Sequence, residues 1–403
     1  MNKKILLIST IYPLPDKNNK GTKVCHFFAK EWVDAGYDVR VIHLQAVYPR
    51  PLYWIARLSS KKITAKTGAV VYTERDNKIS QYEMDSVPVS RIPVFKSIPH
   101  GPFSKRVVNK TIREIVRLNS EAGFIPDAVI GHFTNPVIEI VGKLKKHYGG
   151  ARSCVVVHGD VAMTKEIYKD RLPELMEDID VWGFRCEAVR RKWENKISTP
   201  EKSFICYSGI PEQNITVRNT HSFPDKLERF IYVGEMIERK YPSVIIDALE
   251  AAYPDGDYKM TYVGDGKELE HIKAIIAEKQ IGERISMTGR LQRDEICKHY
   301  DAADCFVMIS RGEAYGLVYL EAMARGCITI ASRNQGFDGV IKDGINGFLC
   351  RAGDAEELAS VIARINAMTP EERQEISENA IKTAKWLTDK NAAAMYINDV
   401  IEA

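Results

Sequence analysis

The sequence has no long apolar run and almost no net charge. It holds no uninterrupted apolar stretch of the roughly 18 residues that a membrane-spanning helix needs. The first apolar segment, residues 5–10, is too short for the core of a signal peptide. The formal net charge is only +3, which does not indicate a general nucleic-acid binder. We therefore expect a cytoplasmic protein that has no nucleic-acid partner.

Cysteine pairs are also missing. The eight cysteines are scattered and form no C-x-x-C motif. Several stand in apolar runs, as Cys154 does before residues 155–157, so we expect reduced core thiols. The composition, 45% apolar and 28% charged, is that of a soluble globular protein. A chain of 403 residues is too long for one ordinary core and predicts two or three domains.

Short apolar segments alternate with helical patterns in the first half of the chain. The expected strands are 5–9, 39–44, 128–131 and 154–157, with a helix at 22–35. This rhythm favours an α/β domain with a parallel, helix-covered sheet. A polar stretch from Ser208 to Asp225 then indicates a linker.

The same alternation resumes near Phe230. The expected strands are 230–234, 258–263, 285–289, 305–309 and 328–331, and the expected helices are 244–252, 267–275, 293–300 and 317–325. This pattern predicts a second doubly wound, Rossmann-like domain. We place the domains at residues 1–210 and 211–385, followed by a final helical segment at 386–403.

The segment 310–326 combines two acids with a turn and a helix. An apolar strand leads into it, Gly316 permits a tight turn, and residues 317–325 are rich in helix formers. The first amides of such a helix have no internal partner and favour an anion. Glu321 lies one turn into the helix, and Glu313 stands in the loop before it. The pattern suits a phosphate with sugar hydroxyls beside it.

The spacing Glu313-x7-Glu321, with Gly316 and the run 321–326, resembles the signature of retaining nucleotide-sugar glycosyltransferases of family 4. The resemblance implies the GT-B fold, in which two doubly wound domains face each other across a cleft and the last helix returns to the first domain. It implies that Glu313 contacts the donor sugar and Glu321 the ribose. The amides of Leu317 and Val318 match positions that hold the distal phosphates.

The segment 234–240 resembles the part of the family in which two cations clamp the diphosphate. Lys240 matches the lysine of that pair, but Glu235 stands where the family has arginine. A carboxylate there repels a pyrophosphate, so Arg239 or Arg290 supplies the second cation, or Glu235 points away, or the donor is held differently. We expect charge neutralisation by cations and helix amides, without a metal or another cofactor.

Four further positions resemble the family. His158 ends an apolar strand, as does His132, and the family has a histidine at the first of these places that contacts the donor sugar. Gly21 opens a helix after the first strand and suits a glycine loop near substrate. Gly264 begins a turn that matches one lining the nucleotide pocket, although no G-x-G-x-x-G is present.

Residues 48–67 interleave apolar and aromatic side chains with lysine and arginine, and more bases follow from 96 to 117. This composition suits contact with an anionic membrane, but an insertion that packs on its own domain would look similar. The sequence leaves both open.

The expected function is retaining transfer of a hexose from a nucleotide sugar to a glycan acceptor that is lipid-linked. The setting would be surface-polysaccharide or glycolipid synthesis at the inner face of the membrane. An epimerase of the same fold, a glycoside hydrolase with paired carboxylates and a non-enzymatic sugar-binding protein are the alternatives.

Overall fold

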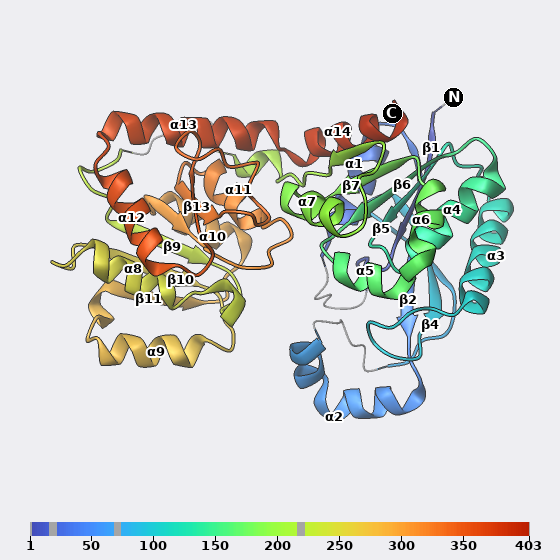
Figure 1. Ribbon diagram of the computed structural model, residues 1–403, viewed down its shortest axis with the longest axis horizontal. Helices are drawn as coiled ribbons and strands as arrows, with labels where there is room; N and C mark the ends of the chain where they lie inside the picture. Colours follow the sequence, from blue (N-terminus) through green and yellow to red (C-terminus); the bar gives the residue numbers. More distant parts are fainter. Residues whose placement is uncertain (1, 16–21, 68–73, 216–221, 403) are drawn as a thin grey trace. The chain divides into compact units, whose positions relative to one another are not determined.

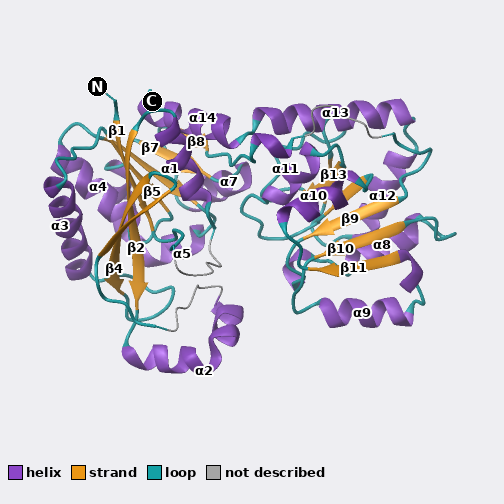
Figure 2. Cartoon of the chain, turned by 180° about the vertical axis from the view of Figure 1, so that it is seen from behind, coloured by secondary structure: helices purple, strands orange, loops and turns teal. Residues whose placement is uncertain are grey.

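The structure is a computed structural model that describes residues 2–15, 22–67, 74–215 and 222–402, except for the side chains of 60–67. The chain divides into two compact units. Unit 1 comprises Met1–Arg185, Val189–Cys206 and Ala392–Ala403, and unit 2 comprises Cys186–Ala188 and Tyr207–Asn391. Both are α/β layers with helices over a central sheet (Figures 1 and 2).

Unit 1 is built on an eight-stranded sheet. In spatial order its strands are β3 (Ser80–Met84), β4 (Val87–Phe95), β2 (Asp38–Val47), β1 (Lys4–Ser9), β5 (Ala128–His132), β6 (Arg152–Val157), β7 (Val181–Phe184) and β8 (Ser203–Ile205). Neighbouring strands run parallel, except that β3 pairs antiparallel with β4. The order changes direction between β1 and β5, which makes their carboxyl ends the ligand-binding point of such a sheet.

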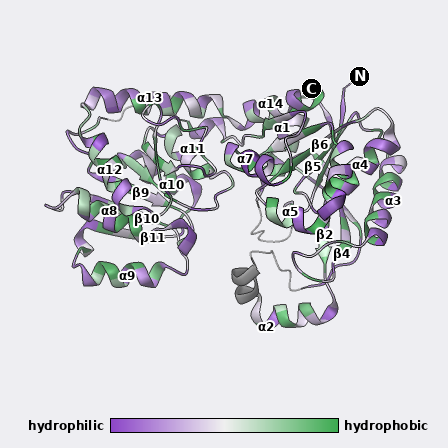
Figure 3. Cartoon of the chain, viewed as in Figure 1, coloured by the Kyte–Doolittle hydropathy of each residue, from purple (hydrophilic) through white to green (hydrophobic). Residues whose placement is uncertain are grey.

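Successive side chains of a strand point to opposite faces of the sheet, and helices cover both faces of the sheet in unit 1. Ile5 and Leu7 share a core with helices α1 (Val24–Asp34) and α14 (Asp389–Ile401). The other face is covered by α4 (Val137–Tyr148), which contacts β5 and β6 and packs against α3 (Lys105–Glu121). Consecutive residues of the central strands are buried, as a parallel sheet covered by helices on both faces requires. Figure 3 draws much of these strands in green, the colour of hydrophobic residues.

The remaining helices of unit 1 are α2 (Arg50–Thr67), α5 (Val161–Tyr168), α6 (Leu172–Glu177) and most of α7 (Glu187–Lys196), with a 3₁₀ turn at Lys169–Arg171. Helix α2 projects beyond the ends of β2 and β4 in both views (Figures 1 and 2). Its backbone is kinked at Ser59, where φ is −148°.

Unit 2 has six parallel strands. In spatial order they are β11 (Ile285–Gly289), β10 (Lys259–Val263), β9 (Arg229–Val233), β12 (Cys305–Val307), β13 (Ile328–Ser332) and β14 (Phe348–Cys350). The helices are α8 (Val244–Ala252), α9 (Leu269–Glu278), α10 (Arg293–Asp301), α11 (Leu317–Ala324), α12 (Ala355–Asn366) and α13 (Pro370–Trp386), with 3₁₀ turns at Glu212–Asn214, Glu238–Lys240 and Gly282–Arg284. Along the chain, the sheet of unit 2 begins with β9 and continues on one side of it with β10 and β11. The later strands, β12, β13 and β14, lie on the other side of β9. The switch point therefore lies between β9 and β12.

The prediction of two doubly wound, Rossmann-like sheets is confirmed. One local boundary differs from the expectation. The last helix begins at Asp389, because Thr388 leaves the helix to pair with Ile210, and Trp386 belongs to α13. The segment expected to be a linker is in part tied to unit 2, since the Ser208 carbonyl oxygen accepts a hydrogen bond from Tyr315 at 2.7 Å.

All eight cysteines are free thiols, and all but Cys297 are buried. The expectation that the cysteines lie in the core is therefore confirmed for seven of them. In the parts of the chain that the structure describes, no helix has both the length and the apolar character of a membrane span.

Candidate active site

The loops that follow β9 and β10 approach each other so closely that only glycine fits. A Cβ atom on Gly264 would lie 2.0 Å from the carbonyl oxygen of Gly234, and one on Gly266 would lie 2.2 Å from that of Met236. Gly264 also has a φ of +140°, which L side chains rarely adopt. These contacts hold the loop of residues 234–240 against the neighbouring turn, beside the switch point. The resemblance to the family had placed Gly264 in a turn that lines the nucleotide pocket.

Gly316 forms the turn that starts α11. Its φ is +90°, and a Cβ atom there would lie 2.5 Å from the ring of Tyr319 and 3.2 Å from Cγ of Glu313. The turn therefore needs glycine for both its backbone angle and its space. It leaves the first amides of α11, including those of Leu317 and Val318, without partners inside the helix, which is a feature that favours an anion.

Two cations and one carboxylate meet at the switch point. Oε2 of Glu313 lies 3.7 Å from Nη1 of Arg239 and 3.8 Å from Nζ of Lys240. A backbone hydrogen bond joins the loop after β9 to the loop after β12, because the amide of Arg311 donates to the carbonyl oxygen of Arg239 at 2.7 Å. The Lys240 side chain is only 13% exposed. Its burial lowers its pKa from the ordinary value, and the Glu313 carboxylate opposes that shift.

Glu235, the residue that replaces the family arginine, is exposed. Its charge still reaches Lys240, since it is among the groups that raise the pKa of that lysine. Arg290, one of the two candidates for the second cation, is 73% exposed and lies 3.9 Å from Asp265. Arg239 is the candidate that the structure brings to Lys240 and Glu313.

Glu321 on α11 is paired with a residue that the sequence did not reveal. Its Oε1 accepts a hydrogen bond from Nη2 of Arg293, the first residue of α10, at 2.8 Å. The Glu321 side chain is 18% exposed. Burial raises its pKa, and Arg293 opposes the shift. Arg293 therefore holds this carboxylate in one orientation, and no local pattern could have linked two residues so far apart in sequence.

His132 ends β5, His158 directly follows the adjacent strand β6, and the two side chains contact each other. Nε2 of His158 lies 2.9 Å from Nδ1 of His132, and the ring of Phe133 stacks on His158 with centroids 4.0 Å apart. Burial, followed by His132 and Arg185, holds the pKa of His158 well below its ordinary value. His158 is therefore neutral near pH 7. Gly21, the remaining candidate, lies outside the described residues.

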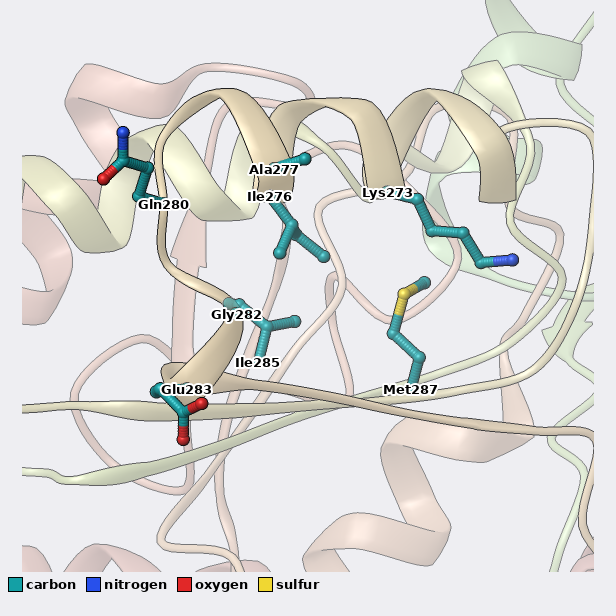
Figure 4. A pocket seen from close by; sticks show the side chains of 8 residues that line it. All are labelled: Lys273, Ile276, Ala277, Gln280, Gly282, Glu283, Ile285 and Met287. Atoms are coloured by element: carbon teal, nitrogen blue, oxygen red, sulfur yellow. The ribbon is translucent and has the colours of Figure 1, made fainter.

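A hollow elsewhere in unit 2 is not the site. It lies between α9 and β11 and is lined by Lys273, Ile276, Ala277, Gln280, Gly282, Glu283, Ile285 and Met287 (Figure 4). None of these residues belongs to the loops that carry the candidate side chains. Among the described residues, no three His, Cys, Asp or Glu side chains gather as ligands of one metal ion would.

Comparisons with known proteins find likenesses of this chain in sequence and in fold. Residues 213–383, which include Lys240, Glu313 and Glu321, match the family described as glycosyl transferases group 1. The amylovoran biosynthesis glycosyltransferase AmsK of Erwinia amylovora is 24% identical over 384 residues, which cover 90% of each chain. The lipopolysaccharide 1,2-N-acetylglucosaminetransferase of Salmonella typhimurium is 26% identical over 226 residues, which cover 54% of each.

A solved structure of HepE from Anabaena in complex with UDP resembles the whole fold, with a TM-score of 0.68. Its sequence identity is 15%, and the match covers 99% of this chain and 100% of that one. These findings support a GT-B glycosyltransferase. The region that matches the family lies in unit 2, which holds the two cations and both acids of the E-x7-E pattern.

Proposed function

We propose that this chain is a retaining glycosyltransferase of family 4 that takes a hexose from a nucleoside diphosphate sugar. Unit 2 binds the donor. The observation that carries the proposal is the meeting of Arg239, Lys240 and Glu313 at the switch point. The first amides of α11 have no partner inside the helix. Together with them, this group offers positive charge to a diphosphate and a carboxylate to the sugar beside it. Glu321, held by Arg293, accepts hydrogen bonds from the ribose.

In the proposed reaction the bond between the anomeric carbon and the diphosphate oxygen breaks. The acceptor oxygen forms its bond to the same face of that carbon, and its proton passes to the departing phosphate oxygen. Negative charge grows on the leaving diphosphate, where Lys240, Arg239 and the amides of Leu317 and Val318 stabilise it. The chemistry needs no metal and no other cofactor in this proposal. His158 is a residue that contacts the sugar.

The test is incubation of the protein with UDP-, GDP-, ADP- and TDP-sugars, each with and without lipid-linked glycan acceptors. We expect one donor whose nucleoside diphosphate is released faster when an acceptor is present, and a product with the donor's anomeric configuration by NMR. Thermal shifts with the free nucleoside diphosphates should identify the base, because a ligand at 100 times its Kd adds about 2.7 kcal/mol of stability. An epimerised donor without transfer, or sugar binding without turnover, would contradict the proposal.

We also propose that the acceptor is a lipid-linked glycan and that the protein works at the inner face of the membrane. The names of the relatives, which refer to amylovoran and lipopolysaccharide synthesis, support a role in surface-polysaccharide assembly. Helix α2 supplies the surface for the membrane. Its Trp54, Ile55 and Leu58 are 71%, 46% and 75% exposed, whereas Tyr53 and Ala56 face inward. Large exposed apolar side chains among bases are typical of helices that lie in a membrane interface.

We expect the protein to sediment with vesicles that contain anionic phospholipid at low salt. The double variant Trp54→Ser/Leu58→Ser should bind them more than tenfold more weakly, because each side chain contributes about 1.5–3 kcal/mol when it leaves water. Ile125→Ser is the matched control, since Ile125 is 69% exposed in unit 1 but lies outside α2. Equal sedimentation of the wild type and the double variant would remove the assigned role of α2.

A further inference from the structure

Three buried or half-buried side chains of unit 1 form a continuous row of hydrogen bonds. The hydroxyl of Tyr396 on α14 lies 3.1 Å from Nε2 of His132. Nδ1 of His132 lies 2.9 Å from Nε2 of His158. Both ring nitrogens of His132 are therefore used, and Tyr396 and His132 are 1% and 0% exposed. The row begins in the last helix of the chain and ends at the candidate sugar-contacting histidine.

The surroundings hold the row in place. Tyr396 packs between the rings of Phe28 and Trp32, with centroids 5.0 and 5.2 Å away. At the other end Phe133 stacks on His158. Aromatic contacts of this kind fix ring planes, so the two histidines have little freedom to turn away from each other. Both ring nitrogens of His132 and Nε2 of His158 therefore keep defined hydrogen-bond partners.

Proton positions in the row depend on one another. Each neutral imidazole has one donor nitrogen and one acceptor nitrogen. If Tyr396 donates to Nε2 of His132, then His132 carries its proton on Nδ1 and donates to Nε2 of His158. His158 must then carry its own proton on Nδ1. The opposite assignment reverses every bond and puts the His158 proton on Nε2.

The Tyr396 hydroxyl decides between these assignments. Among the described residues, its hydrogen-bond partner is Nε2 of His132. In the opposite assignment the phenol proton would turn away from this ring, and the buried hydroxyl would lose its use as a donor. In the first assignment the phenol proton points to the imidazole nitrogen, which is a strong acceptor. Burial lowers the pKa of His132 to about 3, so this ring stays neutral and keeps an acceptor nitrogen at neutral pH.

We propose that Tyr396 and His132 are positioning residues that fix His158 in the tautomer with its proton on Nδ1. The inference rests on the proposed function, because it is the sugar-contacting role of His158 that gives the tautomer a purpose. His158 then presents an N–H donor to an oxygen of the bound sugar or its phosphate, and has no free lone pair to act as a base. Helix α14 thereby determines the chemistry of a residue more than 230 positions earlier in the chain.

The tautomers can be measured directly in the full-length protein labelled with ¹⁵N-histidine. Two-bond ¹⁵N–¹H correlation spectra near pH 7 show which ring nitrogen carries the proton, and His132→Gln and His158→Gln variants assign the signals. We expect protonated Nδ1 on both rings in the wild type. A His158 ring protonated on Nε2 in the wild type would overturn the proposal, whether or not any variant folds.

Tyr396→Phe keeps the ring packing and removes only the hydroxyl. We expect the His158 signals to move toward the other tautomer and kcat to fall about two- to tenfold, as loss of one hydrogen bond allows, with an unchanged KM for the donor found in the screen. Tyr148→Phe is the control, because it too removes one hydroxyl, the one that accepts from Asn119 at 2.9 Å, in the same unit. It should change neither the tautomers nor kcat.

The outcomes separate this inference from the proposed function. If no nucleotide sugar supports transfer, the proposed function fails, while the spectra still decide the tautomer. If transfer occurs but Tyr396→Phe leaves the His158 signals or kcat at the wild-type values, the positioning role is wrong and the proposed function stands.

Discussion

Lys240→Ala is expected to reduce sugar transfer by at least about a hundredfold, as removal of a single charge-stabilising donor does in other enzymes. The Lys240 side chain is largely buried and lies 3.8 Å from Glu313, so no bulk cation can replace its charge. The melting temperature should change little, since burial already disfavours the charged form of this lysine. Steady-state kinetics with the donor found in the screen and a thermal melt measure both effects. Folded Lys240→Ala protein with wild-type transfer would remove the assigned role.

Lys259→Ala is the matched control. Lys259 opens strand β10, at the end of the sheet opposite the switch point, and its Nζ donates to the carbonyl oxygen of Glu283 at 2.8 Å. It belongs to the same unit, and its loss removes the same charge from the molecule. Transfer by this variant should stay within about twofold of the wild type, because exposed charges away from a site contribute little.

The pH dependence of donor binding provides an independent test of Lys240. Because burial lowers its pKa, this lysine loses its proton at a lower pH than an ordinary lysine does. The affinity for the free nucleoside diphosphate should therefore be highest below that lowered pKa and fall as pH rises through it. Calorimetry at a series of alkaline pH values measures the fall. In Lys240→Ala the same series should be flat over this range.

Sequence reasoning was most successful where function depends on short stretches of chain. The strand, turn and helix around Gly316 lie where the pattern predicted them, because a glycine turn between an apolar strand and good helix formers has few alternatives. The resemblance to the family also picked out Lys240, which the structure brings to Glu313. In both cases the relevant contacts follow from the doubly wound order, which places the loops after β9 and β12 side by side.

Contacts between segments that lie far apart in the chain could not be predicted from the sequence. Arg293 meets Glu321 only because α10 and α11 begin near each other in space, and nothing in either segment encodes the partner. Tyr396 meets His132 across 264 positions. The positions of such pairs depend on how whole layers pack, whereas composition and periodicity report only local structure.

Glu313→Gln should separate sugar turnover from nucleotide binding. The carboxylate of Glu313 lies between 3.7 and 3.8 Å from the two cations that we assign to the diphosphate. It therefore competes with the phosphates for Arg239 and Lys240 while it orients the sugar. Its neutral analogue has the same shape but gives up this attraction, which is worth up to about 1 kcal/mol for a partly exposed pair.

We expect transfer by Glu313→Gln to fall about a hundredfold or more, because a hydrogen-bond acceptor aimed at the reacting sugar is lost. The free nucleoside diphosphate should bind as well as to the wild type, or up to about fivefold more tightly, since both cations become available to it. Calorimetry with the bare nucleotide gives the second value, and Glu357→Gln, which removes a carboxylate bound to Arg333 at 2.9 Å, is the control. If turnover and nucleotide affinity fall together, Glu313 supports the phosphate site itself, and its assignment to the sugar is wrong.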